Sequence, residues 1–89
     1  MTERTLKIVN SKGLHARASA RFVEVVENFD ASCDVTKDGE TTSGDSIMCL
    51  LMLAASYGTT IDIKTEGSDA EPLADALEAL VADRFGEDS

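Results

Sequence analysis

The sequence predicts an α+β fold in which helices cover one face of a half-buried sheet. Four short segments alternate apolar and polar residues, as strands do when one face lies in the core and the other in water. Three further segments repeat apolar residues at helical spacing. These segments follow one another in the order β-α-β-β-α-β-α. We expect residues 1–89 to form one domain, because a chain of 89 residues is long enough for one modest core.

The first strand is expected over residues 5–9, with Leu6 and Ile8 on its inner face. Residues 10–13 then form a loop, and a helix is expected over residues 16–28. The apolar residues of this helix recur at helical spacing and predict its buried stripe. They are Phe22, Val23, Val26 and Phe29.

A hairpin is expected next, with strands over residues 32–37 and 40–43. Asp38 and Gly39 between them favour a tight turn, because both residue types tolerate positive φ. Ser46 is a suitable N-cap for a short apolar helix over residues 47–55.

Gly58 is expected to stop that helix, and the fourth strand follows over residues 60–65. The last helix is expected over residues 70–85, with Ser68 or Asp69 as its cap and Pro72 in its first turn, where a missing N–H is tolerated. Its predicted buried residues are Leu73, Leu77, Leu80, Val81 and Phe85. This order of elements fits two architectures, a ferredoxin-like split βαβ fold and another open-faced sandwich.

Charge is unevenly distributed along the chain. The formal net charge of −9 argues against nucleic acid as a partner, because phosphate backbones attract basic surfaces. Residues 1–23 nevertheless carry five bases and one acid, whereas residues 24–89 carry three bases and sixteen acids. An anion near His15 therefore meets a positive segment at short range, since more distant acids are screened beyond about 8 Å.

The sequence predicts neither a membrane span nor a metal site. The longest apolar run, residues 47–55, has nine residues, whereas a helix needs about 20 to cross a bilayer. The first residues lack the apolar region of a signal peptide. Cys33 and Cys49 lack metal-ligand spacing and are expected to pack as small apolar residues in a reducing cytoplasm. We therefore expect a cytoplasmic protein without cofactor or metal.

His15 is the only histidine, and it lies where the first loop meets the first helix. A helix start presents unpaired N–H groups and the positive end of the helix dipole. Arg17 adds a guanidinium group suited to phosphate. No local serine or cysteine partnership supports a hydrolase, and one imidazole with dispersed carboxylates is a poor metal site. The remaining functional interpretation is that His15 accepts a phosphoryl group. The alternative is that His15 is a surface histidine without a chemical role.

These residues also resemble a known family. The run Gly13-Leu14-His15-Ala16-Arg17, followed by Phe22-Val23, resembles the active-site signature of HPr, the histidine-containing phosphocarrier of the bacterial phosphoenolpyruvate phosphotransferase system. The run Gly44-Asp45-Ser46-Ile47-Met48 resembles the second signature of the family. The resemblance covers residues 5–85.

This resemblance implies an open-faced sandwich of four antiparallel strands with three helices on one face. It implies a carrier rather than an enzyme, in which His15 takes phosphate from Enzyme I and passes it to an EIIA-type domain. Arg17 would steady the phosphate, and we expect Lys12 and Arg21 to take part in docking. A monomer suits a protein that docks serially with larger partners.

One departure from the family pattern concerns Ala18. Many sugar-transport members have proline directly after the arginine, whereas residues 13–20 here look more like the nitrogen-linked regulatory branch. Sugar uptake and regulation therefore both stay open as the role of the carrier.

Two further features could serve function. Ser46 suits an N-cap, and the resemblance implies that a dedicated HPr kinase can also phosphorylate it. Nine consecutive apolar residues cannot all face one core, so we expect part of helix 47–55 to be an exposed docking surface, with Ile47, Met48 and Leu51 protruding. The alternative function is a small ferredoxin-like interaction module without phosphoryl chemistry, which would bind partners through this same helix.

Overall fold

Four segments in which buried and exposed residues alternate form one antiparallel sheet. The order of the strands in this sheet distinguishes between the two predicted architectures. In the computed structural model, which describes residues 1–88, the strands are Thr2–Lys7 (β1), Ser32–Lys37 (β2), Glu40–Ser43 (β3) and Thr60–Glu66 (β4). The order across the sheet is β1-β4-β2-β3, and every neighbouring pair is antiparallel. In a ferredoxin-like fold the third strand lies between the first two, whereas here β4 lies between β1 and β2, so the ferredoxin-like alternative was wrong and the open-faced sandwich is confirmed.

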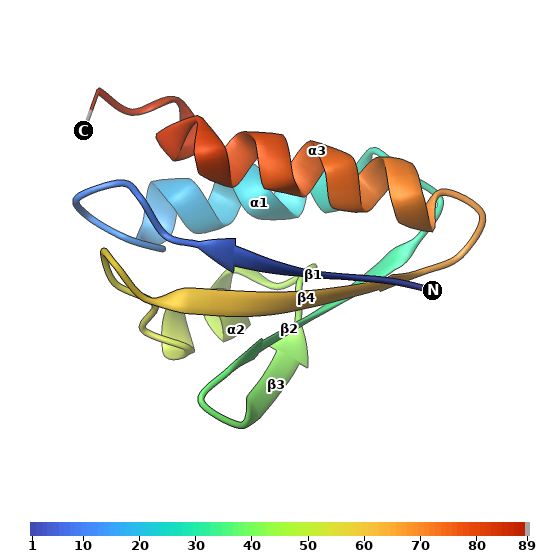
Figure 1. Cartoon of the computed structure of the whole chain (residues 1–89), viewed down its shortest axis with the longest axis horizontal. Helices are drawn as coiled ribbons and strands as arrows, with labels where there is room; N and C mark the ends of the chain where they lie inside the picture. The colour runs from blue at the N-terminus through green and yellow to red at the C-terminus, as the bar shows by residue number, and fades with distance from the viewer. Residues whose placement is uncertain (89) are drawn as a thin grey trace.

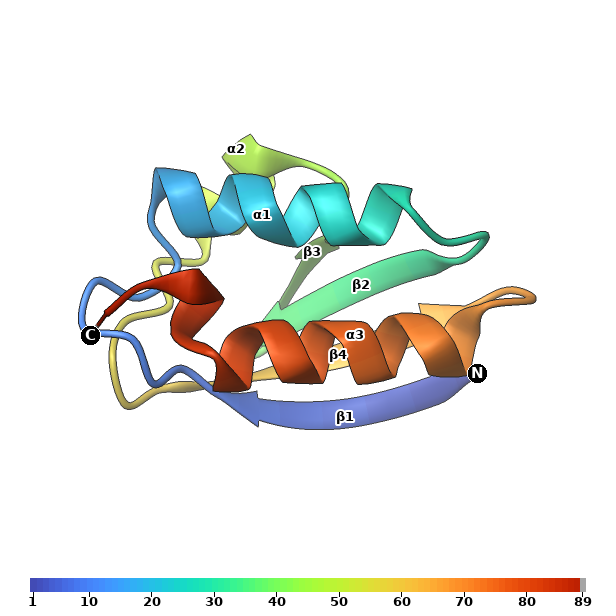
Figure 2. The same ribbon diagram turned by 90° about the horizontal axis from the view of Figure 1, so that it is seen from above.

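The helices lie on one side of this sheet. They are Ala16–Glu27 (α1), Ile47–Met52 (α2) and Ala70–Ala82 (α3), followed by a single 3₁₀ turn over Arg84–Gly86 (η1). Helices α1 and α3 lie side by side and antiparallel across the sheet, and α2 lies on the outer side of α1 (Figures 1 and 2). The start of α1 and the end of α3 consequently meet at the same end of the molecule.

The core fills the space between the sheet and the helices. Each fully buried aliphatic or aromatic side chain contributes about 1.5–3 kcal/mol through removal of its apolar surface from water. The fully buried residues include Ile8, Phe22, Val35, Leu50, Ile61, Leu73, Leu77 and Phe85. Leu80, which was predicted to be buried, is only half-buried at the edge of this core.

Two salt bridges tie the edge strand β1 to α3. The guanidinium of Arg4 lies 2.8 Å from an Asp75 carboxylate oxygen and 2.7 Å from one of Glu78. Both acids stay exposed on the outer face of α3 while they pair with Arg4 across the helix–strand interface. Exposed pairs of this kind stabilise a fold only weakly, because water and salt screen their charges.

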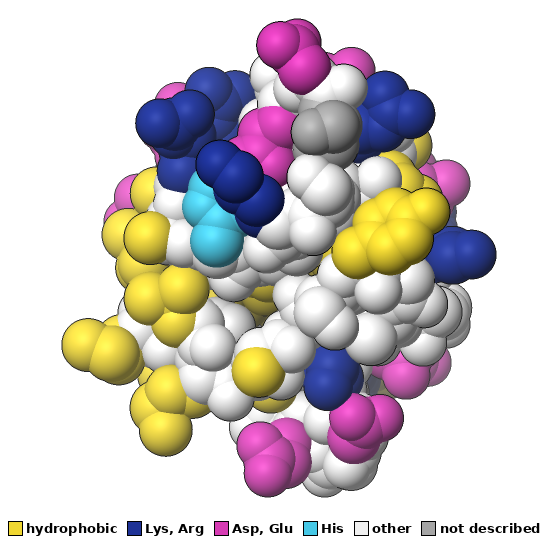
Figure 3. Space-filling view, turned by 90° about the vertical axis from the view of Figure 1, so that its left-hand side faces the viewer, with side chains coloured by type: hydrophobic (Ala, Val, Ile, Leu, Met, Phe, Trp, Pro, Cys, Tyr) yellow, Lys and Arg dark blue, Asp and Glu magenta, His cyan; other side chains and the backbone are white. Residues whose placement is uncertain are grey.

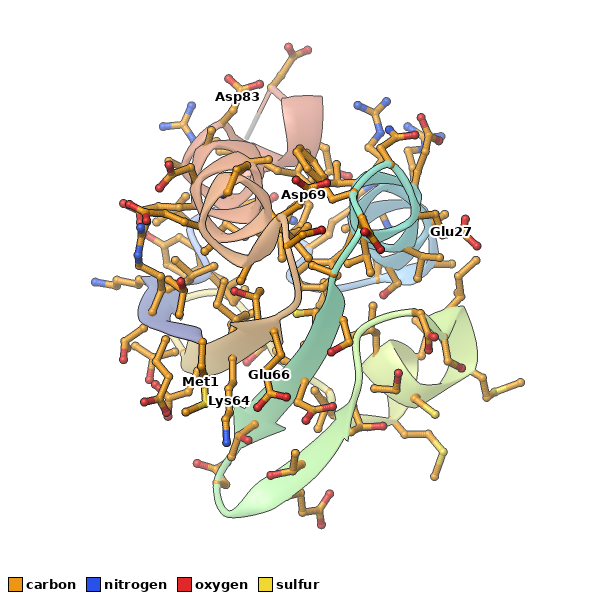
Figure 4. The ribbon with its side chains drawn as sticks, turned by 90° about the vertical axis from the view of Figure 1, so that its right-hand side faces the viewer. Met1, Glu27, Lys64, Glu66, Asp69 and Asp83 are labelled. Atoms are coloured by element: carbon orange, nitrogen blue, oxygen red, sulfur yellow. The ribbon has the colours of Figure 1, made fainter. Side chains whose placement is uncertain are left out.

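The end of the molecule away from the start of α1 is held by contacts between two loops. Asp69, labelled in Figure 4, is the N-cap of α3, but its carboxylate accepts a hydrogen bond from the Asp30 N–H at 2.8 Å instead of capping its own helix. The Ser68 hydroxyl in turn hydrogen-bonds the Asp30 carboxylate at 2.7 Å. The two residues that were predicted as alternative caps thus both join α3 to the chain that follows α1.

Three elements have bounds that differ from the prediction by two residues or more, whereas α1 and β4 each differ by one residue at one end. The first strand begins at Thr2 and ends at Lys7, because Ile8 hydrogen-bonds the turn of residues 58–59. Helix α2 ends at Met52 rather than at residue 55, since Ala54 has a φ of +53° and cannot continue a helix. Helix α3 ends at Ala82, and the left-handed Phe85 turns its ring into the core.

The cysteines are free thiols. Burial raises the pKa of the Cys33 thiol to about 12, so it packs as an apolar residue, as predicted. Cys49 is half-buried at the start of α2.

The loop before α1 passes very close to the chain after α2 at Gly13. Gly13 has a φ of +64°, and a Cβ added there would lie 2.4 Å from the Ala55 carbonyl oxygen. The neighbouring Leu14 N–H donates to that same carbonyl at 2.8 Å. A side chain at position 13 would therefore push apart the two segments that this hydrogen bond joins.

We predict that Gly13→Ala lowers the free energy of unfolding by about 3 kcal/mol, because it adds a backbone clash to left-handed strain. Gly39→Ala is the matched control. Its φ is +84°, but no atom lies within 4 Å of the added Cβ, so strain alone should cost about 1 kcal/mol. Chemical denaturation of both variants measures the difference, and equal losses would contradict the close approach at Gly13.

Candidate functional site

His15 is the N-cap of α1, and its ring takes part in the cap. Its backbone is extended (φ −78°, ψ −175°), and its Nδ1 atom accepts a hydrogen bond from the Arg17 N–H at 3.3 Å. A ring nitrogen that accepts a backbone N–H carries no proton. The imidazole is 27% exposed. The structure therefore presents a partly exposed imidazole with an unprotonated Nδ1 atom at the positive end of a helix dipole.

The other ring nitrogen of His15 contacts Glu87, which lies beyond the last helix. His15 Nε2 forms a short contact with Glu87 Oε2. The second carboxylate oxygen of Glu87 accepts a hydrogen bond from the Asn10 amide at 2.9 Å. The hydrogen bond from Asn10 lowers the pKa of Glu87 most, and the hydrogen bond and charge of His15 lower it further, against the opposing effect of desolvation.

Asn10 is fully buried, and its amide orientation follows from its neighbours. Its Nδ2 atom donates to the Gly13 carbonyl at 2.7 Å as well as to Glu87. Both neighbours are acceptors, so only the amide nitrogen can face them. Its Oδ1 atom has no hydrogen-bond partner within residues 1–88. Asn10 thus fixes the loop before His15 and the carboxylate beside His15 at the same time.

A basic rim surrounds a shallow cavity of about 320 Å³ next to this cluster. It is lined by Lys12, Arg17 and Arg21 together with Ser11 and residues 86–88. Dark blue basic side chains around the cyan histidine mark the rim in Figure 3. The structure therefore brings together three of the five bases predicted to surround His15, whereas Arg4 pairs with acids of α3 on the side of the sheet.

A larger hollow of about 560 Å³ lies over the outer face of the sheet, away from the histidine. It is open and lined by acids, bases and threonines of the strands. The Thr5 hydroxyl donates to an Asp62 carboxylate oxygen at 2.6 Å within this lining, but both residues are exposed on the open face of the sheet, so the size of the hollow does not by itself indicate chemistry.

Apolar side chains of α2 gather beside the histidine. Ser46 caps this helix, and its hydroxyl accepts a hydrogen bond from the Cys49 N–H at 3.2 Å. Leu50 is fully buried against α1, and the outer side chains are exposed: 41% for Ile47, 68% for Met48, 36% for Leu51 and 76% for Met52. Yellow side chains beside the histidine in Figure 3 belong to this face. The predicted protrusion of Ile47, Met48 and Leu51 agrees with these exposures.

Sequence reasoning missed three residues of this region, namely Asn10, Glu87 and Met52. Met52 lies within the predicted apolar helix but was not among the residues expected to protrude. Its position around the helix axis, which the structure shows, is what exposes it. Asn10 and Glu87 carry no local signal, because their partners are set by the fold. No group of three metal-ligating side chains occurs in the described part of the chain, and none of its helices is long and apolar enough to span a membrane.

Comparison with known proteins places the chain in a family. The family model described as "PTS HPr component phosphorylation site" matches residues 2–83. The chain belongs to the HPr family. It is 42% identical over 87 residues to the phosphocarrier protein HPr of Cupriavidus necator, with 98% of each chain covered. It is 38% identical to the phosphocarrier protein NPr of Shewanella violacea, covering 98% of this chain and 96% of the relative.

The structure agrees with this assignment. A crystal structure of HPr-C-His from Thermoanaerobacter tengcongensis superposes with a TM-score of 0.95 at 37% identity and covers the whole of both chains. HPr proteins are phosphocarriers of the phosphotransferase system rather than catalysts, and the chain belongs to this family of carriers. The open-faced sandwich that the HPr resemblance implied is confirmed.

Glu87 should contribute to stability in a pH-dependent way. Its pKa in the folded chain lies below the usual 4.5, so its ionised form favours the folded state. This contribution is complete above pH 4.5 and is lost as the pH falls through the folded-state pKa. We predict that Glu87→Ala lowers the free energy of unfolding near neutral pH and that the difference from the wild type vanishes in acid. Denaturation curves over a pH series test this, and a constant difference would contradict it.

Proposed function

We propose that this chain accepts a phosphoryl group from Enzyme I on Nδ1 of His15 and passes it to an EIIA-type acceptor. One observation carries the proposal, namely that the unprotonated Nδ1 atom lies at the start of α1. Membership of the phosphocarrier family supports it. The free thiols of both cysteines suit the cytoplasmic setting that we propose for this transfer.

The transfer forms one bond and breaks another. The Nδ1 lone pair attacks phosphorus while the bond from phosphorus to its donor breaks, and the donor leaves with that electron pair. Nδ1 carries no proton, so no base has to remove one. The N–H groups at the start of α1 then face the phosphoryl oxygens and stabilise them by about 0.3–1 kcal/mol. Such modest stabilisation suits a carrier that must release its group again.

Basic residues next to His15 would complete the phosphate site. Arg17 is exposed two residues from His15, and its forked guanidinium can donate two parallel hydrogen bonds to phosphate. Lys12 and Arg21 line the same cavity. In a chain with a net charge of −9, this local positive charge would attract acidic surfaces of partner proteins.

The exposed face of α2 is the proposed docking surface for Enzyme I and the acceptors. Its methionines suit several partners, because their side chains are flexible and polarizable. Ser46, half-buried at the start of this face, is a proposed site for regulatory phosphorylation by an HPr kinase/phosphorylase. A phosphate there would place two negative charges beside the apolar side chains and weaken docking of an acidic partner.

The role of the carrier is transport or regulation. Relatives named HPr and NPr both match the full chain at similar identity, and Ala18 stands where many transport members have proline. Transfer assays against a sugar-type and a nitrogen-type EIIA domain would decide between the two roles.

Incubation with phosphoenolpyruvate and Enzyme I should add one acid-labile phosphoryl group, as measured by mass spectrometry. His15→Ala should abolish the addition. Arg17→Ala should slow the transfer roughly tenfold, which corresponds to loss of one hydrogen bond to a charged group. Arg4→Ala is the matched control, because Arg4 pairs with α3 instead of lining the site, and it should transfer at the wild-type rate. An unmodified wild-type chain with active Enzyme I would overturn the proposal.

Met48→Asp should raise the KM of Enzyme I for this chain roughly tenfold without changing kcat, because it places a charge in the proposed apolar contact. Ala79→Asp adds the same charge at an exposed position of α3 and should leave KM unchanged. Steady-state transfer assays measure both constants. Equal effects of the two variants would mean that net charge, rather than the α2 face, governs docking.

A further inference from the structure

The segment after α3 has an unusual backbone that directs it toward His15. Three consecutive residues adopt left-handed conformations, with φ values of +55° at Arg84, +54° at Phe85 and +79° at Gly86. Left-handed φ costs a side-chain-bearing residue about 1 kcal/mol or more, so it persists only where surrounding contacts impose it. Phe85 supplies such a contact, because its ring is fully buried in the core.

This turn delivers Glu87 to a defined position. The Gly86 N–H donates to the Asp83 carbonyl and the Glu87 N–H to the Arg84 carbonyl, each at 2.9 Å. A Cβ at Gly86 would lie 2.5 Å from an Arg21 guanidinium nitrogen, so the chain passes directly beneath that side chain. The Glu87 side chain is only 14% exposed and is held by two partners, His15 and Asn10. A carboxylate held at both oxygens is an ordered part of the site.

We infer that Glu87 is a positioning residue for His15, which together with Asn10 keeps the imidazole proton on Nε2 and leaves Nδ1 as the nucleophile. This inference rests on the proposed phosphoryl transfer. The proton assignment follows from the contacts: an ionised carboxylate only accepts hydrogen bonds, so the Nε2 atom beside it must donate one. Nδ1 then has a lone pair, which accepts the Arg17 N–H in the resting state.

Glu87 also has a role during the transfer itself. When the Nδ1 lone pair forms the bond to phosphorus, the bond to the donor breaks and the proton on Nε2 stays in place. The ring becomes a phosphoryl imidazolium with a positive charge. The carboxylate on Nε2 offsets that charge as it develops, which a neutral side chain cannot do. Because it lies on Nε2, it leaves the Nδ1 side open to the donor.

Glu87→Gln gives a sharp test, because an amide has one donor end and one acceptor end. The Asn10 Nδ2 atom needs an acceptor, so the glutamine carbonyl should turn toward it and the glutamine NH₂ toward His15 Nε2. Nε2 must then accept, which moves the ring proton to Nδ1. The protonated Nδ1 would then place its N–H against the Arg17 N–H, so that two donors face each other. Nδ1 would also have lost the lone pair that attacks phosphorus. Glu87→Ala imposes no such reversal, since the Arg17 N–H still favours an unprotonated Nδ1.

The experiment combines nitrogen-15 NMR of the unphosphorylated chain with transfer kinetics. Above neutral pH, the wild-type ring should carry its proton on Nε2, and the glutamine variant should shift it toward Nδ1. Transfer from phosphorylated Enzyme I should be fastest for the wild type, slower for alanine, and slowest for glutamine, with kcat reduced roughly tenfold or more and KM little changed. Asp83→Asn, an exposed carboxylate nearby in the sequence, is the matched control and should behave as the wild type.

Several outcomes would overturn the inference: a wild-type proton on Nδ1, a glutamine variant that transfers at the wild-type rate, or one that transfers faster than the alanine variant. The last result would assign Glu87 a mere space-filling role. If the wild type accepts no phosphoryl group at all, the proposed function fails. The NMR measurement then still decides whether Glu87 positions the ring, because it needs no transfer.

Discussion

A buried amide holds together the two segments on which the site depends. Asn10 donates one hydrogen bond to Gly13 in the loop that leads into α1 and another to Glu87, 77 residues further along the chain. Removing this amide would leave a carbonyl and a carboxylate without their buried donor, which costs more than an average hydrogen bond contributes. The loop geometry at Gly13 sets the start of α1, and the start of α1 sets the orientation of His15. The fold around Asn10 therefore determines the chemistry available at the histidine.

The arrangement explains how an acidic protein can handle an anion. Sixteen of its seventeen acids lie beyond residue 23 in the sequence, and two of them are paired with Arg4 at the β1–α3 interface. The rim around the histidine keeps Lys12, Arg17 and Arg21 together. Glu87 and Asp88 are acids that also line this cavity, and the Glu87 carboxylate is held at Nε2 of His15 and at Asn10 instead of at Nδ1. Local geometry, more than net charge, decides what the site attracts.

The shortness of α2 matters for the same reason. Left-handed Ala54 ends the helix, and the Ala55 carbonyl then accepts the Leu14 N–H beside His15. The apolar run is thereby split into a helical part with an exposed face and a connecting part that is bonded to the histidine loop. If α2 continued through residue 55, the Ala55 carbonyl would point along the helix axis and could not accept the Leu14 N–H. The proposed docking face and the site are thus joined through one backbone hydrogen bond.

Local chemistry by itself determined the strand alternation, the turn at Asp38 and Gly39, the helix starts, and the roles expected of His15 and Arg17. These features rest on neighbours a few residues apart, which explains why the limits of β2 and β3 matched the prediction. The helix ends differed, because the burial of Phe85 and the hydrogen bond to Ala55 impose left-handed residues that no local propensity favours. The antiparallel order of the sheet and the partners of His15 were likewise decided only by the tertiary structure. The contact between His15 and Glu87 spans 72 residues, and only packing of the whole chain brings two such distant side chains together.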